Sequence, residues 1–382
     1  MPKIRVLVVD DSVVIRRLVT DILNSDPELE VVGAAANGKI ALAKITQVNP
    51  DILTLDIEMP EMDGLQTLKE LRKTYPKLPV IMFSTLTSRG GEATLEALTL
   101  GANDYVTKPA NVGGITEGMQ RVKDDLIPKI KALCGRSMGL SSGSMPQGKL
   151  FTRMASHAAL PMVQGFAKPI NTGFQNARPA VTKRIDIVAI GVSTGGPNAL
   201  AEVLPLLPGN LPVPMVITQH MPPVFTRLLA ERLSSKCALK VREGEPGAVL
   251  EPGTIWLAPG DYHMTLVRNG TRLHLALNQE PPENSCRPSV DVMFRSVVGY
   301  FSGNTLGVIL TGMGQDGLRG CQYIKEAGGQ VLAQDEASSV VWGMPGFVAK
   351  AGLADKVMPL DQIGPEIARR VNVGRALTVN TV

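Results

Sequence analysis

The first third of the chain alternates short apolar runs with longer stretches in which apolar residues recur every three or four positions. The short runs are typical of buried strands, and the longer stretches are typical of amphipathic helices. We expect strands over residues 4–9, 29–34, 52–55, 80–83 and 104–106, and helices over residues 13–23, 38–47, 64–73, 92–100 and 115–133. This alternation predicts an α/β fold, in which a five-stranded, doubly wound parallel sheet carries helices on both faces.

The second half of the chain returns to the same alternation. Apolar, β-branched runs over residues 185–190, 213–218 and 305–310 predict further buried strands. The Asn269-Gly270 dipeptide separates two alternating segments and predicts an antiparallel hairpin. We therefore expect a larger doubly wound, mostly parallel α/β domain that carries one antiparallel hairpin.

Between these two regions neither apolar period is sustained, and Gly, Ser, Pro and Asn recur. Such a composition buries too little apolar surface to offset an ordering cost of about 1–2 kcal/mol per residue. We expect a flexible or loosely docked linker over residues 134–183, which could include a short helical piece near 152–163; the alternative is an irregular part of a domain. The predicted domains are then residues 1–133 and 184–382.

Composition narrows the class of protein. A chain of 382 residues is too long for one ordinary core. No apolar run approaches the ~18 residues that cross a bilayer, so we expect no membrane insertion. Asp10 and Asp11 follow the first apolar run, which is unlike a signal peptide, and this indicates a cytoplasmic protein. The four cysteines are scattered and form no CxxC pair, which disfavours a disulfide framework or a zinc site.

The net charge of +4 is unevenly placed. Residues 126–184 hold nine positive charges and no Asp or Glu, so the rest of the chain carries a net charge of −5. The basic character belongs to this middle segment and does not indicate a basic globule. We therefore expect no nucleic-acid partner.

Polar residues stand at the carboxyl ends of four predicted strands in the first region. They are Asp10 and Asp11 after the first strand, Asp56 after the third, Ser84 and Thr85 after the fourth, and Lys108 after the fifth. Parallel strands bring these ends to one edge of the sheet. Carboxylates gathered there suit Mg²⁺, and a lysine with a hydroxyl suits the oxygens of a phosphoryl group.

This order of residues resembles the receiver domain of two-component response regulators over residues 3–125. The resemblance implies that Asp56 accepts the phosphoryl group. It also implies that Asp10, Asp11, Asp56 and the backbone carbonyl of Glu58 hold Mg²⁺. By the same resemblance Ser84 is the switch hydroxyl, Lys108 pairs with the phosphate, and Tyr105 is the aromatic residue that changes rotamer.

The second region opens with a strand, a glycine-rich turn and a helix. Gly191-Val192-Ser193-Thr194-Gly195 follows the strand, and Pro197 begins an apolar helical pattern. This context is typical of a nucleophile elbow, which lifts the Ser193 hydroxyl off the sheet edge. The same glycines could instead cradle a phosphate, so the turn alone leaves both interpretations open.

A serine nucleophile needs a base and an acid that orients it. Of the four histidines, only His220 directly follows a predicted buried strand as Ser193 does; His157 lies in the linker, and His263 and His274 lie on the hairpin. Asp316 lies in the glycine-rich loop after a third strand. The competing acids are Asp261, Asp291 and Asp335.

Five segments in this order, "GVSTGGP", "QHMPPVFT", "CRPSVDVMF", "LTGMGQDG" and "WGMPG", resemble the CheB family, the protein-glutamate methylesterases of bacterial chemotaxis. The resemblance implies a triad of Ser193, His220 and Asp316. It also implies an oxyanion site at Thr194 and Met313, and a substrate cleft lined by residues 287–291, with Arg287 first. The chain order of the triad differs from that of α/β-hydrolases.

The resemblance further implies a reaction and its partners. The expected substrates are methylated glutamates, and specific glutamines, on the cytoplasmic domains of chemoreceptors. A chemotaxis histidine kinase is the expected phosphodonor, and the esterase reaction itself needs no cofactor. Two other functions remain as alternatives: a non-catalytic output domain that binds a phosphate-bearing ligand at residues 193–197, and a DNA-binding regulator, which the lack of a basic helix-turn-helix pattern disfavours.

Overall fold

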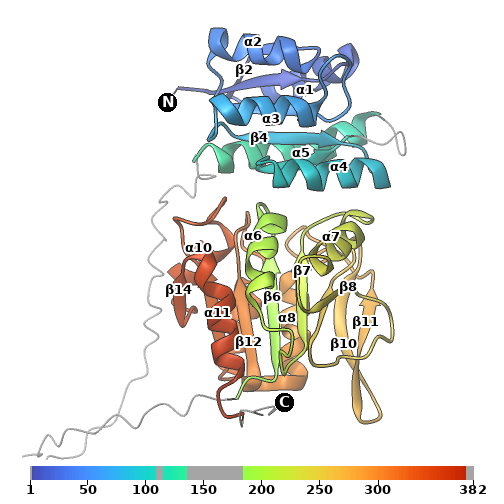
Figure 1. The fold of residues 1–382 in the computed structure, drawn as a ribbon, viewed down its shortest axis with the longest axis vertical. Helices are drawn as coiled ribbons and strands as arrows, with labels where there is room; N and C mark the ends of the chain where they lie inside the picture. The colour runs from blue at the N-terminus through green and yellow to red at the C-terminus, as the bar shows by residue number, and fades with distance from the viewer. Residues whose placement is uncertain (1, 109–114, 136–183, 376–382) are drawn as a thin grey trace, which may run out of the picture. The chain divides into compact units, whose positions relative to one another are not determined.

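The computed structural model describes residues 2–108, 115–135 and 184–375 (Figure 1). Its first sheet is parallel throughout, with the strand order β2-β1-β3-β4-β5. The strands are β1 (Ile4–Val9), β2 (Leu29–Ala35), β3 (Ile52–Asp56), β4 (Val80–Ser84) and β5 (Asp104–Thr107). The helices are α1 (Val13–Asn24), α2 (Gly38–Val48), α3 (Gly64–Thr74), α4 (Ser88–Thr99) and α5 (Ile115–Leu133).

Alternate strand residues face the two layers of helices. Val6 and Val8 of β1 lie in one buried cluster with residues of α1 and α5. Leu7 and Val9 lie in another with residues of α2, α3 and α4. Both faces are therefore covered, as a parallel sheet requires, and the expected doubly wound fold is confirmed.

The second sheet has seven strands in the order β14-β13-β12-β6-β7-β9-β8, and all neighbours are parallel. Its strands are β6 (Ile187–Val192), β7 (Met215–Gln219), β8 (Lys240–Glu243), β9 (Thr254–Leu257), β12 (Thr305–Ile309), β13 (Gln330–Gln334) and β14 (Lys356–Met358). The predicted hairpin forms a separate antiparallel pair, β10 (His263–Asn269) and β11 (Arg272–Asn278). The expected larger α/β domain with one hairpin is thus confirmed.

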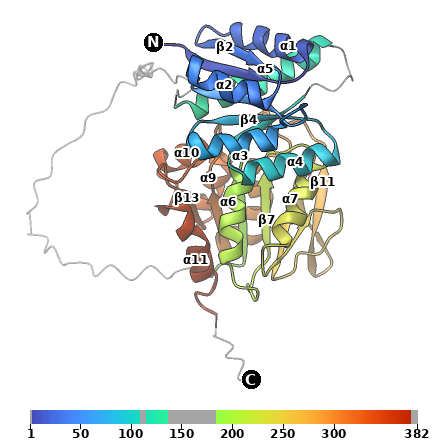
Figure 2. The ribbon, with the colours of Figure 1, turned by 45° about the horizontal axis from the view of Figure 1, so that its top comes forward.

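Helices cover both faces of this sheet too. They are α6 (Gly196–Val203), α7 (Phe225–Ser234), α8 (Val290–Phe301), α9 (Leu318–Glu326), α10 (Met344–Lys350) and α11 (Leu360–Val371). Val188 and Ile190 of β6 pack with residues of α6, α7 and α11. Ile187 and Ala189 pack with residues of α8, α9 and α10. Figure 2 shows α6, α7 and α11 on one side of the strands.

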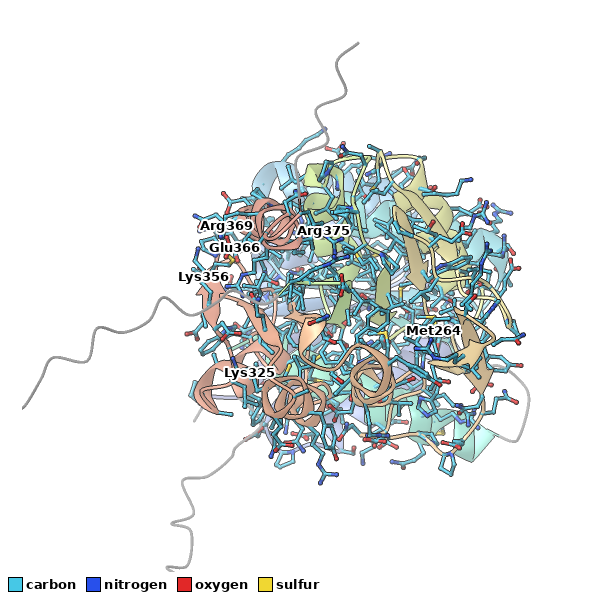
Figure 3. The ribbon with its side chains drawn as sticks, turned by 90° about the horizontal axis from the view of Figure 1, so that it is seen from below. Met264, Lys325, Lys356, Glu366, Arg369 and Arg375 are labelled. Atoms are coloured by element: carbon cyan, nitrogen blue, oxygen red, sulfur yellow. The ribbon has the colours of Figure 1, made fainter. Side chains whose placement is uncertain are left out.

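Ion pairs lie at the end of the second sheet where its parallel strands begin (Figure 3). Arg369 and Arg370 hold Glu366 at 2.7 and 2.9 Å. These hydrogen bonds, with the one from Arg369 contributing most, lower the pKa of Glu366 to about 2. Arg375 lies 2.9 Å from Asp186, just ahead of β6, so the segment after α11 is anchored beside the start of the central strand.

The structure also corrects element boundaries. Strand β6 ends at Val192 and not at residue 190, because Gly191 and Val192 pair with Thr218 and Gln219 of β7. Helix α4 begins at Ser88 and not at residue 92, because Thr87 caps it by accepting a hydrogen bond from the Gly90 N–H. Strands β8, β9 and β14 have only four, four and three residues and were not predicted.

The expected helical piece near 152–163 and His157 lie outside the described residues. The described residues on both sides of the predicted linker belong to one compact unit. The three-part division of the chain stays a prediction. Within the described ranges, no helix is both long and apolar enough to cross a membrane.

Candidate functional site

Ser193 lies at the carboxyl edge of the second sheet, directly after β6. Its N–H donates to the Thr311 carbonyl oxygen at 3.0 Å, which ties the turn to the loop that follows β12. The two loops touch: a side chain at Gly312 would place its Cβ 2.8 Å from that of Ser193. Gly195 has a φ of 79°, a conformation that favours glycine. The glycines of both loops therefore allow the backbone to approach Ser193 closely.

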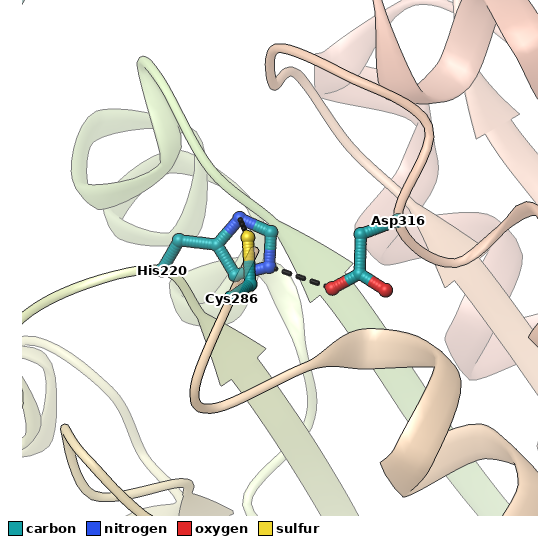
Figure 4. A group of neighbouring side chains, drawn as sticks. All are labelled: His220, Cys286 and Asp316. Carbon is teal, nitrogen blue, oxygen red and sulfur yellow. Dashed lines mark hydrogen bonds and ion pairs between the residues drawn. The ribbon is translucent and has the colours of Figure 1, made fainter. Parts of the chain in front are cut away.

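His220 directly follows β7, the strand next to β6. Its backbone N–H donates to Val192, and its Nε2 lies 2.8 Å from Oδ2 of Asp316 (Figure 4). Asp316 comes from the loop after β12, on the other side of β6 in the sheet. Three neighbouring strand ends thus bring Ser193, His220 and Asp316 to one edge.

The Asp316 carboxylate is buried and fully hydrogen-bonded. It accepts from the Ser289 hydroxyl, the Asn284 amide and the backbone N–H groups of Val290, Asp291 and Gly317, besides His220. Burial alone would raise the pKa of Asp316, but the His220 hydrogen bond and the backbone donors hold it below its usual value of 3.8. An ionised carboxylate in this position fixes the orientation of the imidazole ring.

The second ring nitrogen of His220 faces a residue that the sequence did not single out. Sγ of Cys286 lies 3.6 Å from Nδ1 (Figure 4). Burial would lower the pKa of His220, but Cys286 and Asp316 both favour the charged ring and raise the pKa to about 10. A scattered cysteine gives no spacing signal, so only its position within "CRPSVDVMF" could have pointed to it.

Two backbone donors remain free beside Ser193. Within the described residues, neither the Thr194 N–H nor the Met313 N–H has a protein acceptor. Thr194 itself is buried, and its carbonyl accepts from the Thr311 hydroxyl at 2.9 Å. The described side chains include no hydrogen bond from Ser193 Oγ to the His220 ring; such bonds are often long before substrate binds.

The other candidates take different roles. Arg287 is held by Asp261 through Nε at 3.0 Å. Asp291 is 1% exposed and accepts from the Gly320 N–H at 2.6 Å, so its side chain does not line an open cleft. Asp335 holds Ser338. None of these acids contacts His220 in the described part of the chain.

The two hairpin histidines lie apart from Asp316. His263 is buried and accepts from the Ser289 N–H at 3.2 Å. His274 lies 2.9 Å from the Gly247 carbonyl oxygen. Both rings have structural partners, and of the three described histidines only His220 contacts a carboxylate.

The first sheet carries a second polar site at its own carboxyl edge. Oxygens of Asp10, Asp11 and Asp56 lie within 4.8 Å of one another. Lys108 Nζ lies 3.0 Å from Asp10 and 2.8 Å from Asp56. Burial is the main cause that raises the pKa of Asp56 to about 6; Asp10 adds to it, and Lys108 opposes it. The cluster therefore favours a cation that would offset three carboxylates.

The remaining residues of this site are placed as follows. Ser84 is buried, and its hydroxyl donates to the Gly90 carbonyl oxygen of α4 at 3.0 Å. Tyr105 is buried on β5. The Glu58 side chain is exposed and lies 3.7 Å from Arg89. Ser84 thus connects the sheet edge to α4, and among the described residues its hydroxyl forms no hydrogen bond with Asp56.

Within the compact unit of residues 1–138 and 183–382, the two sites are linked by direct contacts. The Thr194 hydroxyl donates to Asp104 Oδ2 at 2.8 Å. The Tyr105 ring stacks on Phe225 with centroids 5.0 Å apart. Asp104 and Tyr105 lie on β5, which ends one residue before Lys108. The strand that presents Lys108 to Asp56 therefore also contacts the residue after Ser193.

Comparisons with known proteins agree with this arrangement. Residues 188–367 match the family described as CheB methylesterase, and residues 6–120 match the response regulator receiver domain. A "Protein-glutamate methylesterase/protein-glutamine glutaminase" of Trichodesmium erythraeum is 53% identical over 97% of this chain and 100% of its own length. One from a Nocardioides species is 50% identical over 97% of this chain and 96% of its own.

A solved structure is similar to the second region. The Thermotoga maritima CheB methylesterase catalytic domain is 41% identical, with a TM-score of 0.48; the match covers 49% of this chain and 99% of that domain.

Proposed function

Because the chain belongs to the CheB family of protein-glutamate methylesterases/protein-glutamine glutaminases with a receiver domain, we propose that Ser193, His220 and Asp316 form its catalytic triad. The enzyme acts in chemotactic adaptation. The observation that carries the assignment is the 2.8 Å contact between His220 and Asp316 at the strand end beside Ser193.

The proposed reaction is acyl transfer from a glutamate methyl ester to water. His220 takes the proton of the Ser193 hydroxyl as Oγ attacks the ester carbonyl, and the imidazolium that forms is stabilised by Asp316. His220 then returns the proton to the departing methoxide, so methanol leaves and an acyl-enzyme remains. Water, activated by the same ring, releases the glutamate carboxylate and frees Ser193.

The backbone supplies the oxyanion site. The free N–H groups of Thr194 and Met313 are donors beside Ser193, where the tetrahedral intermediate develops its negative oxygen. Preorganised donors of this kind typically contribute 10²–10³-fold each in rate. The same intermediate, with ammonia as the leaving group, accounts for release of a glutamine amide.

In the receiver domain, Asp56 is the proposed phosphoryl acceptor. Asp10, Asp11, Asp56 and the Glu58 carbonyl would hold Mg²⁺; the fit rests on the three clustered carboxylates and on Asp10 Oδ2, which is buried and makes no hydrogen bond although Lys108 lies 3.0 Å away. The ion would neutralise the acidic edge against the incoming phosphate. Lys108, already 2.8 Å from Asp56, would pair with the phosphoryl oxygens, with Ser84 and Tyr105 responding to it.

The proposed partners follow from the family. Methylated glutamates on the cytoplasmic domains of chemoreceptors are the substrates, a chemotaxis histidine kinase is the phosphodonor, and the enzyme works in the cytoplasm. Unphosphorylated receiver inhibits the esterase, and the bond between Asp104 and Thr194 supports this because it engages the residue next to the nucleophile. Phosphorylation of Asp56 releases that inhibition.

A serine-directed phosphonate tests the assignment against a non-catalytic output domain. Full-length protein is treated with the reagent, the modified residue is located by mass spectrometry, and methanol release from methylated receptor membranes is followed. We expect one label per chain, on Ser193, with loss of activity in proportion to labelling. Full labelling of Ser193 with unchanged methanol release would contradict the triad, and an untreated protein that releases no methanol would favour the output domain.

A further inference from the structure

Cys286 lies beside His220 although the esterase reaction gives it no role. It belongs to the loop between β11 and α8, where Glu283 and Cys286 exchange two backbone hydrogen bonds of 3.0 and 3.2 Å. Arg295 of α8 holds the Glu283 carboxylate at 2.7 Å. The loop is therefore fixed, and it keeps the sulfur 3.6 Å from His220 Nδ1.

The sulfur of Cys286 lies beside the nitrogen of His220 that is available for catalysis. Nε2 of His220 is engaged by Asp316, so Nδ1 is the nitrogen that remains for the Ser193 hydroxyl and the leaving group. Figure 4 shows the Cys286 sulfur at that nitrogen and Asp316 at the other. Any atom added to Sγ would enter the space that a reacting group needs.

The same geometry supplies a base to the thiol. An imidazole within hydrogen-bond distance can take the proton of a thiol as the sulfur attacks, and a sulfur that has lost its proton is the species that reacts with oxidants. A cavity of about 580 Å³ is lined by Cys286, His220 and Arg287, so small molecules reach the sulfur.

Two other cysteines provide an internal comparison. Cys237 is half-buried, and burial raises the pKa of its thiol to about 11. Cys321 is fully buried, and burial raises its pKa well above the usual value. Neither has a histidine neighbour in the described part of the chain. Cys286 combines access with a base, and these two lack that combination.

We propose that the Cys286–His220 pair is a site of reversible oxidation by a hydroperoxide, and that the oxidised sulfur blocks the esterase. His220 takes the Cys286 thiol proton as Sγ attacks the terminal oxygen of the hydroperoxide; an S–O bond forms and the O–O bond breaks. Sulfur is oxidised to a sulfenic acid, and the released alkoxide, which is hydroxide when the oxidant is hydrogen peroxide, takes the proton back from the His220 imidazolium and leaves as the alcohol or as water. A small thiol reverses the step through a mixed disulfide. The blocking effect rests on the proposed role of His220, whereas the oxidation itself does not.

The test uses full-length protein treated with hydrogen peroxide and dimedone, which traps sulfenic acids. Mass spectrometry locates the adduct, and methanol release from methylated receptor membranes is measured before and after peroxide, and again after dithiothreitol, on samples without dimedone. Cys286→Ser is the test variant and Cys237→Ser is the matched control. We expect the adduct on Cys286 and a loss of activity of about 10²-fold or more in the oxidised fraction, the scale of lost general-base catalysis.

We expect dithiothreitol to restore the methanol-release rate of the oxidised wild type. Cys286→Ser should keep its rate after peroxide treatment, and Cys237→Ser should lose and regain activity as the wild type does. Absence of an adduct on Cys286 would overturn the proposal, and so would a Cys286 sulfenic acid that leaves the rate unchanged. The untreated His220→Ala variant separates failure of the proposed triad from failure of the proposed oxidation. If this variant keeps wild-type activity, the triad is wrong, whatever the chemistry of Cys286.

Discussion

The His220 ring and the Asp316 carboxylate meet at 2.8 Å although 96 residues separate them in the chain. Each follows a parallel strand, β7 and β12, and these strands flank β6, which ends at Ser193. The order of the strands in the sheet therefore brings base, acid and nucleophile together. In a doubly wound sheet, sites form at such strand ends.

The role of His220 predicts a large, specific loss on its removal. His220→Ala should lower kcat for methanol release by about 10⁴-fold or more, because members of such a triad act as a unit. The double variant Ser193→Ala/His220→Ala should be little slower than either single one. His274→Ala is the matched control, since the hydrogen bond of that ring goes to the Gly247 carbonyl oxygen and not to a carboxylate. A fast His220→Ala enzyme beside a slow His274→Ala enzyme would contradict the assignment.

Asp316 predicts a loss of rate with retention of the fold. Asp316→Asn keeps the shape and one acceptor oxygen but no longer stabilises the His220 imidazolium, so we expect kcat to fall by about 10⁴-fold. Asp335→Asn is the control among the competing acids, because Asp335 binds Ser338 and not the histidine. Steady-state methanol release measures the effect, and circular dichroism checks the fold. Equal activities of the two variants would argue against Asp316.

The raised pKa of His220 predicts the pH dependence. The base must be neutral to accept a proton, so kcat/KM should be low below the pKa of the free enzyme and rise above it. In the wild type this rise should lie well above pH 6.5, toward about 10. In Cys286→Ser it should lie lower, because Cys286 is the largest cause that raises the pKa. Rates of Ser193→Ala provide the blank for spontaneous ester hydrolysis; a midpoint that Cys286→Ser does not move would contradict this reading.

Control by the receiver predicts that removing the receiver raises the basal rate and that blocking its phosphorylation does not. A fragment that begins at Ala180 loses the bond between Asp104 and Thr194, so its basal rate should exceed that of the unphosphorylated full-length enzyme. A coupling of 1–3 kcal/mol corresponds to about 5–150-fold. Asp56→Asn in the full chain should stay slow and ignore a phosphodonor. A fragment slower than the intact chain would mean that the receiver activates the enzyme directly.

Strand-end positions were predictable because buried parallel strands have strong apolar patterns. From these apolar patterns alone, Ser193, His220, Asp56 and Lys108 could be predicted to lie at sheet edges. Short strands such as β8 and β14 lack such a pattern and were missed. Contacts made by residues of irregular loops could not be predicted from the sequence pattern either.

Cys286 and Asn284 illustrate that limit. Both come from the loop after β11, whose path is set by backbone hydrogen bonds and by the Arg295 ion pair with Glu283. The pattern of apolar and polar residues in such a loop does not indicate which residues it will contact. The choice among Asp261, Asp291, Asp316 and Asp335 was likewise open from the residues alone, and the contact with His220 now singles out Asp316.

The most direct test of the account is methanol release by full-length Ser193→Ala from methylated receptor membranes. Phosphorylation of Asp56, measured in the same preparation, shows that the protein is folded and that the receiver works. The account predicts normal phosphorylation and a rate that falls by several orders of magnitude, because the acyl-enzyme cannot form without the Ser193 hydroxyl. A residual rate above about a tenth of wild type would contradict a serine nucleophile at this position.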